Sequence, residues 1–148
     1  MTTATKPRKP ARSRVFGLPR LLNRLPISDR AIKKIQAAND MHLLRFYFGT
    51  ADNADVEALY THLIISWGLA GRMHDAEGIR EELWKGIELI NRSFRAKTPR
   101  EMDPQILVAV QDIVRSSLDL WRQTTVDELD HTIDEINREF NAFRKRHK

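Results

Sequence analysis

The sequence predicts an all-α protein: a single-domain bundle of about five helices, preceded by a mobile basic N-terminal arm. Five segments after residue 28 repeat apolar side chains at steps of three and four, the period of a helix with one buried face. Each segment begins near a residue that can cap a helix, and none shows the alternation of a half-buried strand. The 148 residues suit one domain with a core that needs no disulfide.

The first helix is expected to begin at Ser28 or Asp29 and to end at Gly49. Its apolar face is predicted to consist of Ile32, Ile35, Ala38, His42 and Phe46. A buried imidazole needs a hydrogen-bond partner, so His42 should either bond to a polar group in the core or line a pocket. Without a second polar group converging on it in the sequence, the core role is favoured.

The second helix is expected to begin at Asp52 or Asn53, while Gly68 and Gly71 are predicted to end it. Its apolar residues occur on nearly all sides, which is typical of a helix enclosed by others. We therefore predict that this helix is the central and most buried one. The residues concerned are chiefly Val56, Leu59, Tyr60, Leu63, Ile64 and Trp67.

The third and fourth helices each show a single apolar stripe. Asp75 is expected to open the third, whose stripe contains Ile79, Leu83, Ile87, Ile90 and Phe94. Asp103 followed by Pro104 is typical of an N-cap with proline at the first helical position. The fourth stripe then contains Ile106, Val110, Ile113, Ser117 and either Leu120 or Trp121.

The fifth helix has the most regular pattern in the chain. Thr125 and Glu128 have the spacing of a capping box at its start. Its narrow apolar seam, typical of near-parallel helix packing, contains Val126, Leu129, Ile133, Ile136, Phe140 and Phe143. We expect this seam to pack within the same chain as the last helix of the bundle. A homodimeric coiled coil is the alternative, although the seam spans barely three heptads.

The first 28 residues carry seven basic side chains and no acidic one, which predicts an arm over residues 1–27 and a folded domain over 28–148. The basic residues are Lys6, Arg8, Lys9, Arg12, Arg14, Arg20 and Arg24. Residues 29–143 hold 14 basic and 20 acidic side chains, so the body is acidic between two basic ends. Such polarity concerns partners rather than fold, and it indicates a polyanion such as nucleic acid.

The end of the arm also carries a leucine pattern. Leu18, Leu21, Leu22 and Leu25 follow helical spacing, with Pro19 placed to start a short helix and Pro26 to stop it. About two turns are too few for a stable isolated helix, so the segment needs a surface on which to fold. That surface is expected to be the body itself, a groove of a partner protein or a lipid interface.

No catalytic or cofactor motif emerges from the sequence. The absence of cysteine excludes thiol chemistry. Glu128 and His131 have the spacing of a metal-ligand pair, but this pair occurs only once and lies off the apolar seam. We therefore expect both side chains to face water, and we expect no metal or cofactor. The longest apolar stretch, LIISWGLAG, is too short to span a membrane. The expected location is the cytoplasm, and the alternative is that the N-terminus is an organelle transit peptide.

These observations favour a non-enzymatic helical regulator or accessory protein. Its basic arm is expected to contact nucleic-acid phosphates without base specificity, because the arm offers positive charge but a single aromatic ring, Phe16, for base stacking. The alternative is a protein-interaction or assembly module that docks through the segment from Leu18 to Leu25. Neither the identity of the partner nor the oligomeric state follows from the sequence.

Overall fold

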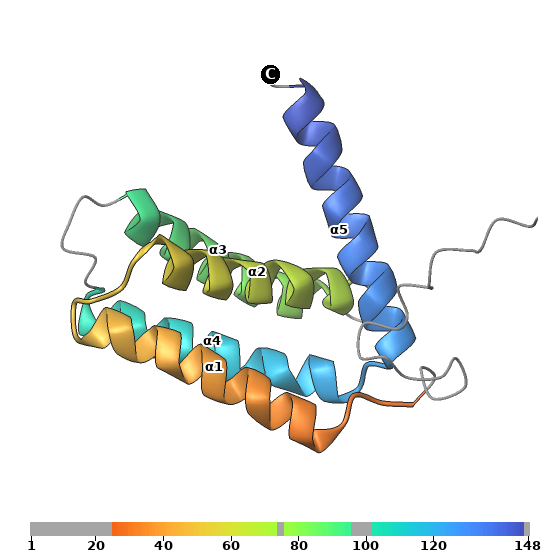
Figure 1. Cartoon of the computed structure of the whole chain (residues 1–148), viewed down its shortest axis with the longest axis horizontal. Helices are drawn as coiled ribbons and strands as arrows, with labels where there is room; N and C mark the ends of the chain where they lie inside the picture. The colour runs from red at the N-terminus through yellow and green to blue at the C-terminus, as the bar shows by residue number, and fades with distance from the viewer. Residues whose placement is uncertain (1–24, 74–75, 96–101, 147–148) are drawn as a thin grey trace, which may run out of the picture.

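The chain is all-α, as the periodicity predicts. The computed structural model describes residues 25–73, 76–95 and 102–146. Within these ranges it contains helices and an isolated bridge between Pro26 and Thr125, with no strand. The helices are α1 (Asp29–Tyr47), α2 (Asn53–Ala70), α3 (Glu77–Arg95), α4 (Pro104–Arg122) and α5 (Val126–Arg146) (Figure 1).

Four helices form the body of the bundle, and the fifth leaves it. Helix α1 lies beside α4, and α2 lies beside α3, while α5 projects steeply from one end of this pair of layers (Figure 1). Helix α2 contacts each of the other four helices, which confirms its predicted central place. The largest fully buried side chains include Phe46, Leu59, Leu63, Ile87 and Ile90, so the core is built from α1, α2 and α3 together with the valines of α4.

Short polar side chains cap the helices where the sequence indicates. Ser28 Oγ accepts a hydrogen bond from Ala31 N at 3.2 Å, and Asp103 Oδ1 accepts one from Gln105 N at 2.8 Å. Thr125 and Glu128 form the predicted reciprocal pair, in which Glu128 N donates to Thr125 Oγ1 at 3.1 Å and Thr125 N donates to Glu128 Oε1 at 3.3 Å. These bonds satisfy amides that the helices themselves leave free.

The buried face of α1 differs from the predicted one. Ala38 is exposed, whereas Asn39 and Leu43 are buried beside Ile32 and Phe46. Asn39 is polar, so apolar periodicity alone does not mark it as a buried position. His42 consequently lies at the margin of the core, with 20% of its side chain exposed.

Gly68 does not end α2, contrary to the prediction. The helix continues to Ala70, and Gly71 is its C-cap. A Cβ at Gly68 would lie 2.7 Å from Thr132 Cγ2 and 3.2 Å from Ile136 Cδ1. The missing side chain therefore serves the packing of α5 onto α2 rather than the termination of the helix.

The described part of the α5 seam, up to Ile136, follows the prediction of packing within the chain. Val126 and Leu129 are buried and Ile133 is partly buried against the core. Residues 137–139, 141 and 142 are exposed along the projecting half of the helix (Figure 1). The side chains of Phe140 and Phe143 lie outside the described residues, so the coiled-coil alternative stays a prediction.

Candidate interaction face on helix α1

The solvent-facing side of α1 combines two kinds of surface along one helix. We call its N-terminal part, Arg30, Lys33 and Lys34, the basic half, and all three side chains are exposed. We call the C-terminal part the apolar half; it consists of Met41, Leu44, Tyr47 and Phe48 from α1 and its C-cap. Steps of three, four and seven residues keep most of these α1 positions on one side of the helix, away from the core.

The basic half begins where the arm joins the body. Ile27 N donates to Thr124 O at 3.1 Å and Val126 N donates to Leu25 O at 3.3 Å, which fixes the chain just before the Ser28 cap. Within the described residues no acidic side chain pairs with Arg30, Lys33 or Lys34.

The placement of Arg30 does not help α1 to fold. A cation in the first turn of a helix lies at the positive end of the helix dipole, which destabilises the helix by roughly 0.3 kcal/mol. Arg30 is the second residue of α1 and therefore occupies such a position. The positive charge of Arg30 therefore does not contribute to the stability of the helix.

The apolar half borders a groove between α1 and α4. The groove has a volume of about 310 Å³, and its apolar lining is Leu43, Leu44, Tyr47 and Leu107. Exposed fractions of 53% for Leu44, 63% for Tyr47 and 69% for Phe48 show how little the bundle covers this surface. The rings of Tyr47 and Phe48 meet edge to face with centroids 5.2 Å apart, so the two aromatic side chains support each other.

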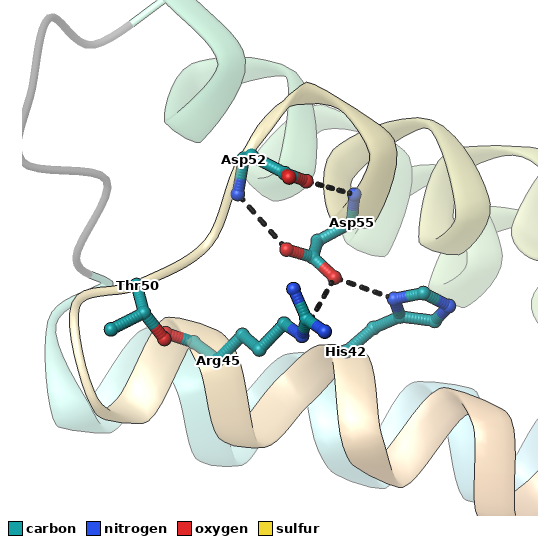
Figure 2. Close-up of polar contacts among 5 residues, drawn as sticks. All are labelled: His42, Arg45, Thr50, Asp52 and Asp55. Carbon is teal, nitrogen blue, oxygen red and sulfur yellow. Dashed lines mark hydrogen bonds and ion pairs between the residues drawn. The ribbon is translucent and has the colours of Figure 1, made fainter.

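A buried carboxylate holds the C-terminal half of α1 against α2. Asp55 Oδ1 accepts a hydrogen bond from His42 Nδ1 at 2.7 Å and lies 3.6 Å from Arg45 Nε (Figure 2). Asp55 Oδ2 accepts from Asp52 N at 2.9 Å, and Asp55 N donates to Asp52 Oδ1 at 3.1 Å, which completes the capping box of α2. Thr50 N donates to Arg45 O at 2.8 Å in the intervening turn.

The charge of Asp55 is stabilised by this geometry. Burial raises the pKa of the Asp55 carboxyl, but the hydrogen bonds from His42 and Asp52, with the Arg45 charge, outweigh it and leave the pKa below its usual value of 3.8. The sequence indicated that His42 needs a polar partner but did not identify Asp55. The signal was available, since Asp55 stands three residues after the Asp52 cap, at the position where a capping-box acid is expected.

A second buried polar network lies between α2 and α4. His62 Nε2 donates to Ser117 Oγ at 2.7 Å, and Ser117 Oγ donates in turn to Val114 O at 2.5 Å. Burial lowers the pKa of the His62 imidazole to about 4, so the ring is neutral at physiological pH.

Trp121 completes this network from the side of α4. Its ring stacks on His62 with centroids 5.1 Å apart, and Trp121 Nε1 donates to Ser66 Oγ at 2.9 Å. Since the Ser117 hydroxyl donates to the Val114 carbonyl, both members of the His62–Ser117 pair have hydrogen-bond partners. The arrangement is that of a satisfied polar core.

The remaining sequence candidates are placed as follows. Glu128 belongs to the α5 capping box, and His131 is exposed. The described part of the chain contains no group of three or more His, Cys, Asp or Glu side chains that could hold a metal ion. Leu25 is 53% exposed. The other predicted arm residues lie outside the described residues: Lys6, Arg8, Lys9, Arg12, Arg14, Arg20, Arg24, Leu18, Leu21 and Leu22.

A second hollow, of about 380 Å³, lies between α3 and α4. Its floor is apolar, with Ile79, Leu83 and Ile113, while Asp112 and Asp119 are among the acidic residues that line it. Acidic side chains repel phosphate, so this hollow is a poor site for a polyanion.

Comparison with protein families, with curated proteins and with solved structures finds no match to this chain. No helix within the described residues is both long and apolar enough to cross a membrane. The α1 face is therefore interpreted from its own chemistry. The apolar half was not predicted from the sequence, although Met41, Leu44 and Phe48 form a second stripe on the side of α1 opposite the core.

Proposed function

We propose that this chain is a non-enzymatic accessory or regulatory protein that contacts nucleic-acid phosphates without reading base sequence. The proposed contact surface consists of the basic arm and the basic half of α1. The observation that supports it is the exposure of Arg30, Lys33 and Lys34 directly after the arm, without acidic partners among the described residues. The three side chains extend the basic run of the arm onto a rigid helix.

Charge is the physical basis of this proposal. Lysine and arginine neutralise phosphates and release condensed counterions, which supplies most of the free energy of sequence-independent binding. The acidic body opposes close contact elsewhere, since residues 29–143 hold 20 acidic against 14 basic side chains. A polyanion should therefore approach from the side of the arm and the first turns of α1.

Protein interaction is the second candidate function, and the apolar half of α1 favours it. Contiguous exposed apolar surface on a small domain commonly marks a contact site. The segment from Leu18 to Leu25 is the second element proposed for such docking, and Leu25 is exposed where that segment meets the body.

The nucleic-acid proposal is tested with two charge-matched variants. Replacing Arg30, Lys33 and Lys34 by Gln removes three charges from the proposed surface. Replacing Lys85, Arg92 and Arg122 by Gln removes three exposed charges from α3 and α4. We expect the first variant to bind duplex DNA more weakly and to lose up to about three units of the salt-dependence slope, while the control stays close to the parent chain. Equal weakening in both variants would argue against a defined basic surface.

A further inference from the structure

The apolar half of α1 is more concentrated than scattered surface apolar residues would be. The described residues expose eight large apolar side chains, and four of them, Met41, Leu44, Tyr47 and Phe48, belong to this one surface. Single exposed apolar residues need no explanation, whereas a contiguous patch around a groove does. The surface is also held rigidly, because His42 and Arg45 on the neighbouring side of the helix are tied to buried Asp55.

The charges at the edge of the groove indicate what covers it. Asp40 and Arg115 both line the groove, and Arg115 Nη2 lies 4.0 Å from Asp40 Oδ1 in a loose ion pair, with Arg115 exposed and Asp40 partly exposed. One acid and one base on the same small surface allow it to complement itself, because a two-fold axis that passes midway between them brings the acid of each copy to the base of the other. An anionic membrane would instead place Asp40 beside lipid phosphates, which is unfavourable.

We infer that the apolar half is the interface of a homodimer. The Met41, Leu44 and Phe48 ridge of each copy lies in the α1/α4 groove of the other, and Asp40 of each copy faces Arg115 of its mate. This assembly differs from a coiled coil through α5, because it uses the opposite end of the sequence and a groove rather than a seam. It also does not depend on nucleic-acid binding.

The first test compares two variants by sedimentation equilibrium. Leu44→Asp places a charge in the middle of the interface. Ile79→Asp makes the same change at an exposed apolar residue of α3, outside it. We expect a dimer for the parent chain and for Ile79→Asp, and at least about a 30-fold weaker dimer for Leu44→Asp, the loss typical of a residue central to an interface. Melting curves establish that both variants are folded.

The second test exchanges the charges. In a homodimer of Asp40→Arg, and equally in one of Arg115→Asp, like charges face each other across the interface, so each variant alone should dimerise weakly. A mixture of the two variants pairs opposite charges at both contacts, so heterodimers should predominate by native mass spectrometry. Charge exchange distinguishes contacts between copies from contacts within one chain, since mixing cannot repair the latter.

Three results would overturn the inference. One is a parent chain that is monomeric at about 100 μM, a concentration at which even a weak specific interface is occupied. A monomer that binds anionic vesicles or another protein would overturn the inference in the same way. Another is a dimer that Leu44→Asp leaves intact. The third is a mixture of the two charge variants that forms no heterodimer.

Discussion

Gly68 of α2 and Thr132 of α5 approach so closely that a single added Cβ at Gly68 would lie 2.7 Å from Thr132 Cγ2. Thr132 has little freedom to move away. Its side chain is buried, its Oγ1 donates to Glu128 O at 2.9 Å, and the same oxygen accepts from Arg72 Nε at 2.9 Å. Through this contact α5 packs closely against α2.

Gly68→Ala should therefore destabilise the protein, although alanine is the better helix former. Crowding of a packed contact costs about 1–3 kcal/mol, against a gain of about 1 kcal/mol from helix propensity. We expect a net loss of about 1 kcal/mol in urea denaturation, recovered in the double variant with Thr132→Ser, which removes the clashing methyl group. Gly78→Ala is the control, since nothing lies within 4 Å of its added Cβ; an equal loss there would contradict the packing explanation.

His62 should make stability fall in mild acid. The unfolded chain takes up a proton at this residue near pH 6.5, whereas burial lowers the folded pKa to about 4. Between these values the unfolded state binds more protons, so the free energy of unfolding decreases as pH falls, by about 1 kcal/mol per pH unit. Urea denaturation at about pH 7.5 and about pH 5 measures the effect.

The His62 contribution is isolated by two variants. His62→Gln cannot titrate, and its amide can still donate to Ser117, so it should reduce the dependence of stability on pH. His131→Gln, at an exposed site, should leave that dependence close to that of the parent chain. If both variants behave alike, the buried imidazole is not the source of the acid sensitivity.

Asp55→Asn should loosen the junction between α1 and α2. The substitution removes the carboxylate that His42 and Arg45 share, and a lost buried hydrogen bond of this kind costs about 1–3 kcal/mol. Thermal unfolding should show a clear loss for Asp55→Asn and almost none for Asp119→Asn, whose carboxylate is exposed and paired with Arg122. Comparable losses of thermal stability in the two variants would mean that the contacts of Asp55 with His42 and Arg45 stabilise the fold no more than a surface ion pair does.

Asp55 affects the pH dependence of stability in a lower pH range than His62 does. Its folded pKa is depressed, so its contribution is fully present above the usual value of 3.8 and is lost as pH falls through the lower folded value. Acid unfolding of the parent chain should therefore show a second decline that Asp55→Asn lacks. A parent curve identical in shape to that of the variant would contradict this assignment.

Local rules predicted the helices well because helix ends depend on a few neighbouring residues. Ser28, Asp52 and Asp103 cap their helices as the sequence indicates, and Thr125 closes its box with Glu128. Each cap requires only an oxygen at the right spacing from a free amide. The all-α fold follows from these signals together with the apolar periodicity.

The errors and omissions arise where a residue's role depends on another helix. Glycine commonly marks the end of a helix, which is why Gly68 was predicted to end α2. The residues that explain it, Thr132 and Ile136 on α5, are 64 and 68 positions away in the sequence. Asn39 is polar and is not among the predicted core residues, yet it is buried. The pairing of His42 with Asp55 and the groove between α1 and α4 likewise require two helices to be placed side by side.

The salt dependence of duplex DNA binding measures the proposed function most directly. If the arm and the basic half of α1 act together, log K should fall linearly with log salt, with a slope of about −0.9 per neutralised phosphate and therefore near −9 for ten contacts. The affinity should be the same for DNA duplexes of unrelated sequence. Deleting residues 1–14 removes five of the seven arm charges, so it should reduce that slope by about 4.5 units and leave the melting temperature unchanged. A full chain that does not bind at low salt, or a deletion that leaves the slope unaltered, would contradict the proposal.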